Sequence, residues 1–232
     1  MRPGISNEML ARAGVRHVEA DEAKTLCNLA AAGLWLSYRD LDGNAIRDGD
    51  SDYGRLRLDA PQDNRKYHQA AGTSVHAYLP PGLKELLLAG GDLFVIEGEF
   101  KAAALTEAGF PAVGISGFYG FGLPANGPLV PELAAVIALL KPARILFCGD
   151  SDTATNFNFA HAAVRLANLV KPLPVLLPRI PINSPGKGAD DCRAKLVGEF
   201  ESWWRDRVAN AVPVAAETTV SRLTITLFEA EA

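Results

Sequence analysis

A nine-residue stretch decides the fold of this chain: LFVIEGEFK, Leu93 to Lys101. Its first four residues are apolar and two of them are β-branched, which predicts a buried strand of a parallel sheet. The strand ends at Glu97, a glycine follows, and an alanine-rich helix is predicted from Lys101 to Ala108. Open α/β sheets bind ligands at the carboxyl ends of their strands, so Glu97 is a candidate site residue.

Two further acidic clusters follow apolar runs. The predicted strand Ile145 to Cys148 leads into Gly149-Asp150-Ser151-Asp152, and the run Leu173 to Leu177 precedes Lys187-Gly188-Ala189-Asp190-Asp191. Acidic clusters at the strand ends of one sheet can converge on one point. Carboxylates that lack basic partners repel one another unless cations neutralise them, so the pattern predicts a hard divalent metal at this edge.

Each aspartate also has a purely structural interpretation. Asp and Ser favour helix N-termini, where they cap exposed amides and suit the helix dipole. Glu97 lacks an obvious capping role because it ends a buried strand, whereas Glu99 is expected to be solvated or paired with a nearby base. The repetition of acidic motifs in successive strand–helix units favours metal chemistry over capping.

From Gly91 onward the chain alternates between strand and helix patterns. Such alternation predicts parallel strands joined by right-handed crossovers. The strands are predicted near 93–97, 111–115, 144–149 and 173–177, and the helices near 100–108, 129–140, 154–170 and 190–208. Beyond Pro213, the segment from Arg222 to Phe228 is apolar enough for an edge strand or a link to a further part.

The first 88 residues carry a different pattern. A helix is predicted from Asp21 to Ala32, followed by a strand from Gly33 to Tyr38 and a turn over 40–44. Tyr53 to Asp59 alternates, so that Arg55 and Arg57 share one strand face and leucines occupy the other. Lys66 lies in a short basic run, RKYH, that continues this patch, and Pro80-Pro81-Gly82 marks the seam before the next part.

Several downstream motifs have two interpretations each. The loop from Ser116 to Gly122 is rich in glycine and aromatic residues, which could stack on a nucleobase or plug the edge of the sheet. Lys101 and Lys187 could contact phosphates or be solvated. The run Pro185 to Gly188 is not a Walker phosphate loop, because the helix-opening Gly-Lys-Ser/Thr is missing.

Composition restricts the class of protein. A formal net charge of −4 argues against a surface that grips nucleic acid by bulk electrostatics, so any such contact needs local basic residues or a metal. Cys27, Cys148 and Cys192 form no zinc pattern with the four histidines, and free thiols suit a reducing cytoplasm. With no signal-peptide pattern and no apolar run near the roughly 20 residues that span a bilayer, we expect a cytoplasmic protein without a membrane partner.

Together these motifs resemble the Toprim domain that topoisomerases share with bacterial-type primases. The stretches Leu36 to Asn44 and Gly54 to Leu58, with Lys66-Tyr67 and Tyr78, are similar to the N-terminal half of a bacterial primase core. The third acidic motif, Lys187 to Asp191, looks like that of plasmid and phage primases. The similarity covers roughly residues 5 to 205 and is moderately specific only when the motifs are taken together.

The resemblance implies an α/β fold: a Toprim domain with a four-stranded parallel core sheet and flanking helices, plus a small N-terminal α+β subdomain. The predicted boundaries are 1–88 for the primase-core-like subdomain, 89–210 for the Toprim domain, and 211–232 for a tail or link. A zinc-binding domain and a following helical subdomain, both found in replicative primases, have no counterpart here. We therefore expect the primase-like part of a larger plasmid or phage replication protein, or a pared-down relative.

The implied activity is that of a DNA primase-like nucleotidyltransferase in DNA replication, with Mg²⁺ or Mn²⁺ as cofactor. Its partners would be a single-stranded DNA template, nucleoside triphosphates and possibly a replicative helicase. Glu97 would accept a proton or help to hold a second metal. The metal ligands would be Asp150, Asp152 and Asp191, the last ranked above Asp190, and the nucleic-acid or nucleotide contacts would be Arg55, Arg57, Lys66, Lys101 and Lys187.

Two alternatives remain. The same acidic cluster with water as nucleophile would make a Toprim-type nuclease. A non-catalytic module would use the acids as helix caps and the N-terminal face to bind nucleic acid or a helicase. A topoisomerase is excluded, because its tyrosine nucleophile lies in a separate large domain for which this chain has no room.

Overall fold

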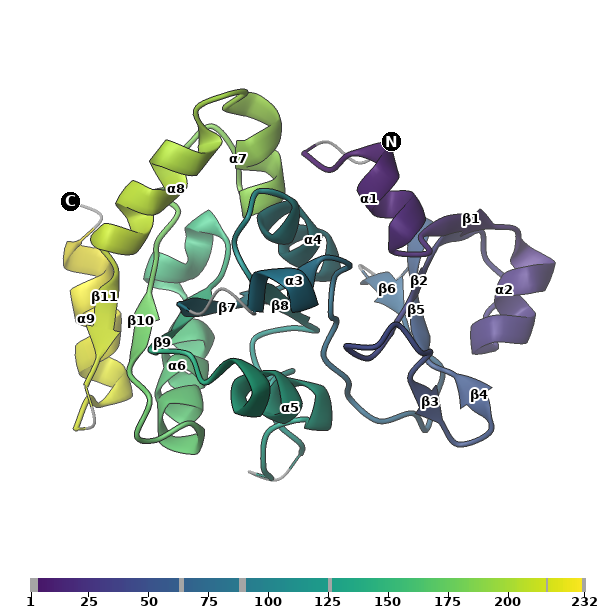
Figure 1. The fold of residues 1–232 in the computed structure, drawn as a ribbon, viewed down its shortest axis with the longest axis horizontal. Helices are drawn as coiled ribbons and strands as arrows, with labels where there is room; N and C mark the ends of the chain where they lie inside the picture. Colours follow the sequence, from purple (N-terminus) through teal and green to yellow (C-terminus); the bar gives the residue numbers. More distant parts are fainter. Residues whose placement is uncertain (1–3, 63–64, 88–90, 125–126, 216, 231–232) are drawn as a thin grey trace. The chain divides into compact units, whose positions relative to one another are not determined.

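The computed structural model describes residues 4–62, 65–87, 91–124, 127–215 and 217–230 (Figure 1). The chain forms two compact units, one comprising Ser6–Val75 and the other Met1–Ile5 with His76–Ala232. The segment after Val75 joins the second unit because the backbone of Tyr78 forms two hydrogen bonds with Gly114, of 2.8 and 2.9 Å. The division therefore lies earlier in the chain than the predicted boundary at residues 88 and 89.

The Ser6–Val75 unit is built on a four-stranded antiparallel sheet. Its strands lie in the order β1 (Arg16–Val18), β2 (Gly33–Ser37), β5 (Gly54–Gln62) and β6 (Arg65–His68). The remaining elements are helices α1 (Asn7–Arg12) and α2 (Ala20–Cys27) and the small pair β3 (Arg47–Asp48) and β4 (Ser51–Asp52). The predicted alternation on β5 is confirmed, because Leu56 and Leu58 are buried against Val18, Ala23, Cys27 and Trp35.

Two local predictions in this unit have different outcomes. The turn over 40–44 is present, and the Asp40 carboxylate accepts hydrogen bonds from the backbone N–H groups of Asp42 and Asn44, each 2.9 Å long. The helix predicted to run to Ala32 is shorter, because Asn28 adopts a left-handed conformation with φ 58° and ends α2 after Cys27.

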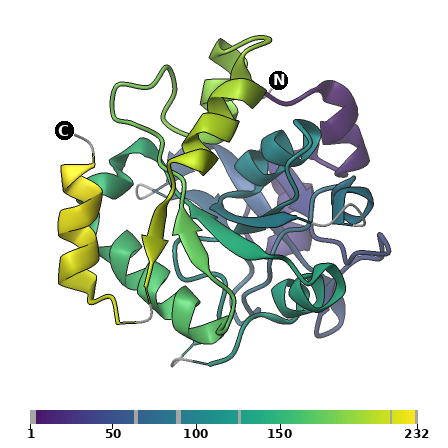
Figure 2. The same cartoon turned by 60° about the vertical axis from the view of Figure 1, so that its left-hand side comes forward.

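The second unit contains a five-stranded sheet in the order β11 (Val212–Val214), β10 (Val175–Leu177), β9 (Arg144–Cys148), β7 (Asp92–Glu97) and β8 (Ala112–Ile115). The four strands β7 to β10 pair in parallel, as predicted. The strand β11 adds an antiparallel edge that the sequence analysis did not predict. Helices cover both faces of this sheet (Figure 2).

The helices of the second unit are α3 (Leu83–Leu87), α4 (Glu99–Glu107), α5 (Pro131–Leu140), α6 (Phe157–Leu169), α7 (Ala189–Lys195), α8 (Phe200–Ala209) and α9 (Val220–Glu229), with a 3₁₀ turn, η1, at Ser151–Thr155. Aromatic contacts assign two of them to opposite faces of the sheet. Phe94 of β7 contacts Trp204 of α8 at 6.1 Å between ring centroids. Phe147 of β9 stacks on Phe159 of α6 at 5.0 Å. Residues 94 and 147 point to opposite faces, because Phe94 pairs with Leu146 and strand side chains alternate.

Two predictions for the C-terminal part are wrong. The helix predicted over 190–208 is two helices, because Gly198 takes a positive φ of 78° in the turn between α7 and α8. The segment from Arg222 to Phe228, predicted as an edge strand or a link, lies within helix α9. Leu223 and Leu227, four residues apart, are buried on one side of that helix, so residues 211–230 are part of the second unit.

Among the described residues, no helix is long and apolar enough to cross a membrane.

Candidate active site

Glu97 and Asp150 leave the sheet at the same edge. Strands β7 and β9 are parallel neighbours, with Ile96 opposite Cys148. Residues 97 and 149, which come next in each strand, therefore lie side by side where the two strands end. Gly98 has a φ of 102°, which glycine adopts without strain, and this turn leads directly into α4. The Glu-Gly pair therefore places a carboxylate at the carboxyl end of β7 and starts a helix behind it.

The capping interpretation fails for Asp150, whereas Asp190 and Asp191 do lie in the first turn of a helix. Asp150 is at the N-cap position of η1, yet its side chain makes no capping hydrogen bond. Its backbone carbonyl accepts instead from the Thr153 N–H at 3.1 Å and from the Thr153 hydroxyl at 2.8 Å. Gly188 is at the N-cap position of α7, so Asp190 and Asp191 lie in its first turn. The Asp150 carboxylate is thus available for other partners.

Those partners are lysines. Lys101 Nζ lies 2.5 Å from Asp150 Oδ1, and the two side chains are 16% and 19% exposed. Lys187 Nζ lies 2.9 Å from Asp152 Oδ2 and 4.0 Å from Asp150 Oδ2. The prediction of a metal site assumed that the carboxylates lack basic partners, and that assumption is wrong. The two lysines are neither merely solvated nor pointing away from the acids.

Asp190 and Asp191 differ sharply in their surroundings. The Asp190 side chain is fully buried, and a Cβ built at Gly188 would lie 2.9 Å from Asp190 Oδ1 and 3.1 Å from Asp150 Oδ1. The same position would be 2.6 Å from Lys101 Cε, so a side chain at 188 would displace the cluster. The Cβ of Asp191 instead lies beside Gly186. This geometry favours Asp190 over Asp191, the reverse of the predicted ranking.

The pKa of Glu97 depends on its burial and on the charges of the other side chains in the cluster. Burial raises the pKa of the Glu97 carboxyl, the positive charge of Lys101 opposes that shift, and the negative charge of Asp150 adds to it. Smaller effects come from Asp152 and Lys187, so both belong to the same electrostatic neighbourhood. On the other side of the pair, the hydrogen bond to Asp152 raises the pKa of the Lys187 ammonium.

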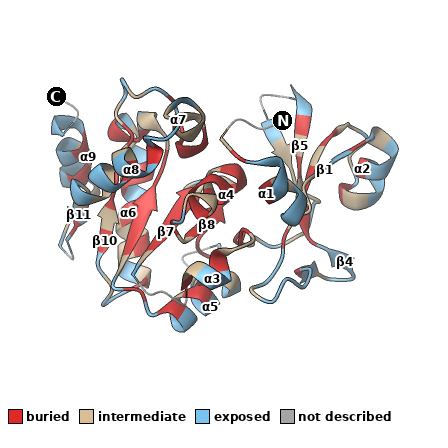
Figure 3. Ribbon diagram, turned by 45° about the horizontal axis from the view of Figure 1, so that its top comes forward, coloured by how far each residue is buried: buried red, intermediate tan, exposed pale blue. Residues whose placement is uncertain are grey.

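Glu99 is a buried carboxylate. Of the two expectations for this side chain, solvation is wrong, because Glu99 is only 1% exposed in the first turn of α4. That helix is buried along most of its length (Figure 3). Burial raises the pKa of Tyr78, and the negative charge of Glu99 raises it further, so this carboxylate lies near the Tyr78 phenol.

The donor atoms of the cluster suit a hard cation, although they form no preassembled metal centre. Carboxylate oxygens are the ligands that Mg²⁺ prefers, and it usually binds through one or two of them together with substrate phosphates. In the part of the chain that the structure describes, no group of three His, Cys, Asp or Glu side chains is arranged to hold a metal. The residues therefore fit a metal that brings further ligands with it. To bind that metal, Asp150 and Asp152 would have to release the ammonium groups of Lys101 and Lys187.

The basic residues of the Ser6–Val75 unit form a separate feature. Arg55 and Arg57 share one face of β5, and the Arg55 guanidinium lies 4.9 Å from the centre of the Tyr67 ring. Arg57 pairs across the sheet with Tyr67, so it shares a face with that ring. Lys66 precedes Tyr67 in β6 and, by the alternation of strand side chains, lies on the opposite face. The patch predicted from Arg57 and Lys66 is therefore divided between two faces.

The aromatic loop after β8 divides in the same way. Phe121 is fully buried and meets Phe147 edge-on at 5.9 Å between ring centroids. Phe118 meets Phe159 at 5.4 Å, so these two rings plug the sheet. Tyr119 remains 37% exposed, and its hydroxyl is hydrogen-bonded to His161 Nδ1 at 3.0 Å. No motif in the sequence links His161 to this loop, and only the fold brings the two together.

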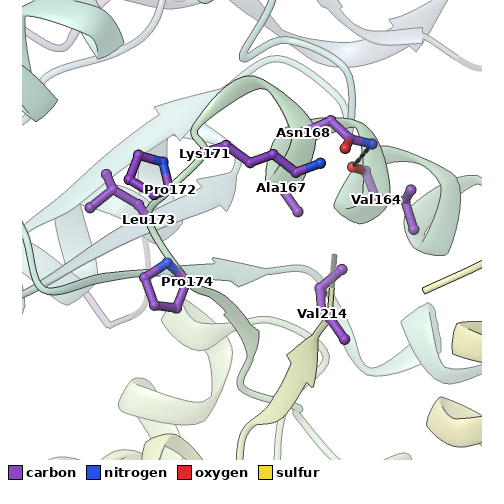
Figure 4. Close-up of a pocket in the computed structure, with 9 residues that line it drawn as sticks. Val164, Ala167, Asn168, Lys171, Pro172, Leu173, Pro174 and Val214 are labelled. Atoms are coloured by element: carbon purple, nitrogen blue, oxygen red, sulfur yellow. Dashed lines mark hydrogen bonds between the residues drawn. The ribbon is translucent and has the colours of Figure 1, made fainter. Parts of the chain in front are cut away.

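A cavity of about 380 Å³ lies beside β11 (Figure 4). It is lined by the end of α6, the segment that leads into β10, and β11: Val164, Ala167, Asn168, Lys171, Pro172, Leu173, Pro174, Val214 and Ala215. The segment 171–174 precedes β10, so this cavity lies at the amino ends of the parallel strands. Glu97 and Asp150 lie at the carboxyl ends of these strands, so the cavity and the candidate active site are at opposite ends of the strands.

Comparisons with known proteins agree with this architecture. Residues 91–198 match a family described as a domain of unknown function, DUF3854, which covers less than half of the chain. A search of curated proteins found no match. The fold is similar to a crystal structure of the zinc-binding and RNA polymerase domains of Aquifex aeolicus primase, with a TM-score of 0.58 and 13% identity. It is also similar to the RNA polymerase domain of Mycobacterium tuberculosis primase DnaG, with a TM-score of 0.51 and 16% identity.

These similarities define a class of fold. The first covers 91% of this chain and 54% of the Aquifex structure, and the second covers 90% and 64%. The chain thus spans between half and two thirds of the structures it matches. At such low identity the comparison shows a mixed α/β fold with a parallel sheet, like that of primase domains.

Proposed function

We propose that this chain transfers nucleotides to a growing strand on a DNA template, as a primase-like nucleotidyltransferase in plasmid or phage replication. One observation carries the proposal: a carboxylate of raised pKa lies beside two lysine-neutralised aspartates at the carboxyl edge of a parallel sheet. The similarity of the fold to primase domains supports the choice of reaction, and we extend it to a Toprim-type arrangement of the acidic motifs.

In the proposed reaction, the 3′-oxygen of one nucleotide attacks the α-phosphorus of a nucleoside triphosphate. A new oxygen–phosphorus bond forms, and the bond to pyrophosphate breaks. Glu97 accepts the proton of the attacking hydroxyl, a role for which a raised pKa is favourable because it makes the ionised carboxylate a better base. Lys187 is 60% exposed and can follow the charged phosphates as pyrophosphate leaves.

Asp150, Asp152 and Asp190 would hold a divalent metal. When bound, Mg²⁺ or Mn²⁺ would supply charge neutralisation at the attacked phosphate. Gly188 keeps the space between Asp150 and Asp190 open, since a Cβ there would meet both carboxylates. Arg57 and Lys66 are proposed to position phosphates of the template or nucleotide, each from its own face of the sheet.

The test uses the full chain with single-stranded DNA, labelled nucleoside triphosphates and Mn²⁺ or Mg²⁺. Extension that depends on template supports nucleotidyl transfer, and shortening of labelled DNA would instead reveal a nuclease. Glu97→Gln should abolish incorporation, because glutamine keeps the size but cannot take the proton. Glu201→Gln is the matched control, since this carboxylate is exposed in the first turn of α8. Absence of both extension and shortening in the wild type would refute the proposal.

A further inference from the structure

An exposed aromatic group lies beside the carboxylates and has no part in the chemistry described so far. It consists of Tyr119 in the loop after β8 and of Phe157 and His161 in α6, and it is here called the aromatic surface. Tyr119 is 37% exposed and Phe157 is 56% exposed. His161 is also exposed.

The Tyr119 ring is held in place by the loop that carries it. Phe118 and Phe121, on either side, are anchored on Phe159 and Phe147. Gly120 folds back so tightly that a Cβ there would lie 2.7 Å from the backbone N and O of Ser116. The loop therefore presents Tyr119 outward on a fixed backbone, and the 3.0 Å hydrogen bond to His161 Nδ1 restricts its ring further.

The helix side of this surface is equally well fixed. Phe157 opens α6, and the Asn156 side chain caps the helix by accepting from the N–H groups of Asn158 and Phe159. Phe157 and His161 are four residues apart, so they are neighbours on one side of the helix. The Tyr119 and His161 ring centroids are 5.7 Å apart, so the loop and the helix meet at these two rings.

The two segments that carry the aromatic surface follow directly on the elements of the candidate active site. Ile115, the last residue of β8, pairs with Glu97, so the loop that carries Tyr119 leaves the sheet at the carboxylate edge. Asp152 lies in η1, which leads directly into α6 and Phe157. Both segments that form the aromatic surface therefore start at the site that we assign to the reacting phosphates.

We propose that the aromatic surface stacks on bases of single-stranded DNA and thereby holds the template beside the candidate active site. The inference extends the proposed function, because it names the contact that the template makes with this unit. Base–aromatic stacking tolerates any sequence, because every base has a π-face, which is what a template contact requires. The Tyr119 ring, which is already held by its loop and by the hydrogen bond to His161, loses little side-chain entropy on binding.

The test compares two single-stranded oligonucleotides of equal length in the absence of nucleoside triphosphates. One is oligo(dT), and the other is an abasic strand that retains the sugar-phosphate backbone. Wild type should prefer oligo(dT). Tyr119→Ala and Phe157→Ala should each weaken oligo(dT) binding roughly 5- to 150-fold, the range expected for loss of one stacked base, and leave abasic binding unchanged.

Two further variants sharpen the interpretation. Tyr119→Phe should retain oligo(dT) binding, because it keeps the ring and removes only the hydroxyl that contacts His161. Leu139→Ala is the control, since Leu139 is 51% exposed near the end of α5, just before β9 begins at the other end of the sheet, and its removal should not affect binding. Thermal melting should show that the alanine variants remain folded, as expected for exposed side chains.

Equal affinity of wild type for the two oligonucleotides would overturn the inference, as would unchanged oligo(dT) binding by both alanine variants. These outcomes are separate from the fate of the proposed function. Nucleotide incorporation together with unchanged binding by the variants would refute only the proposal that the aromatic surface stacks on the template. A clear preference for bases without incorporation would leave the aromatic surface in place and refute nucleotidyl transfer.

Discussion

The ion pair between Lys101 and Asp150 provides the sharpest test of the site, through the substitution Lys101→Met. Methionine keeps an apolar stem of similar length and removes only the ammonium, so the loss is mainly one of charge. Asp150 would then keep a negative charge on a side chain that is only 19% exposed, without the partner 2.5 Å away. The negative charges of Asp152 and Glu97 are in the same neighbourhood.

The expected cost lies between two limits. Removing one partner of a fully buried pair costs about 3–5 kcal/mol, and removing one of an exposed pair costs about 0–1 kcal/mol. Because both side chains here keep a small exposure, we expect a loss of about 2 kcal/mol in the free energy of unfolding, or about 4–8 °C in melting temperature. Lys187→Met is the matched control, because its ammonium is 60% exposed and its loss should cost less than about 1 kcal/mol.

The assay is urea and thermal unfolding, followed by circular dichroism, with and without Mg²⁺. A divalent cation can replace the missing ammonium, so Mg²⁺ should stabilise Lys101→Met more than it stabilises wild type. At ten times its dissociation constant the added stability is about 1.4 kcal/mol. If Lys101→Met is as stable as wild type and responds no more strongly to Mg²⁺, then the ammonium is not the counter-ion of Asp150 and the reasoning fails.

Three further predictions concern the remaining residues. Burial raises the pKa of Glu97 in the folded protein, so the stability of wild type should fall as the pH rises through that raised value. Between about pH 4 and pH 8, the melting temperature of Glu97→Gln should therefore rise relative to that of wild type. Asp190→Asn should weaken Mn²⁺-dependent nucleotide binding about tenfold by calorimetry, and Asp191→Asn should change it less; equal effects would remove the preference for Asp190. Arg57→Ala and Lys66→Ala should each weaken single-stranded DNA binding and reduce the salt slope by about 0.7, and unchanged slopes would place the DNA path elsewhere.

The parallel sheet could be predicted because its strands are apolar on both faces. Leu93 to Ile96 are all buried, as expected for a strand that is covered by helices on both sides. The C-terminal part was harder, because Leu223, Ile225 and Leu227 alternate with polar residues as in a strand. The same leucines are four residues apart, and the Thr219 hydroxyl caps the segment as a helix. Ile225 is consequently 57% exposed, which a strand prediction could not anticipate.

The edge strand β11 was missed for a related reason. Pro213 interrupts its three residues, and proline usually ends regular structure. An edge strand tolerates proline, because an N–H group that faces away from the sheet is not needed for pairing. Here Pro213 lies opposite Leu176 in an antiparallel pair with β10. The pattern of residues alone does not say which strand will be at the edge.

The position of the carboxylates follows from strand ends, but the direction of each side chain does not. Neighbouring residues in a helix point about 100° apart, so only one of Asp190 and Asp191 can face Asp150, and the loop before α7 decides which. In the same way the backbone of the aromatic loop buries Phe121 and exposes Tyr119. Such choices depend on tertiary packing, which no single-sequence pattern records.

The lysines give the site a property that its acidic motifs alone do not predict. Asp150 and Asp152 are each paired with an ammonium, so these two carboxylates have counter-ions without a metal. Binding of a metal alone would leave the displaced ammoniums without counter-ions. Binding of a metal together with a triphosphate would supply new anions for Lys101 and Lys187. We therefore expect metal and nucleotide to bind cooperatively, each raising the affinity of the other by the same factor.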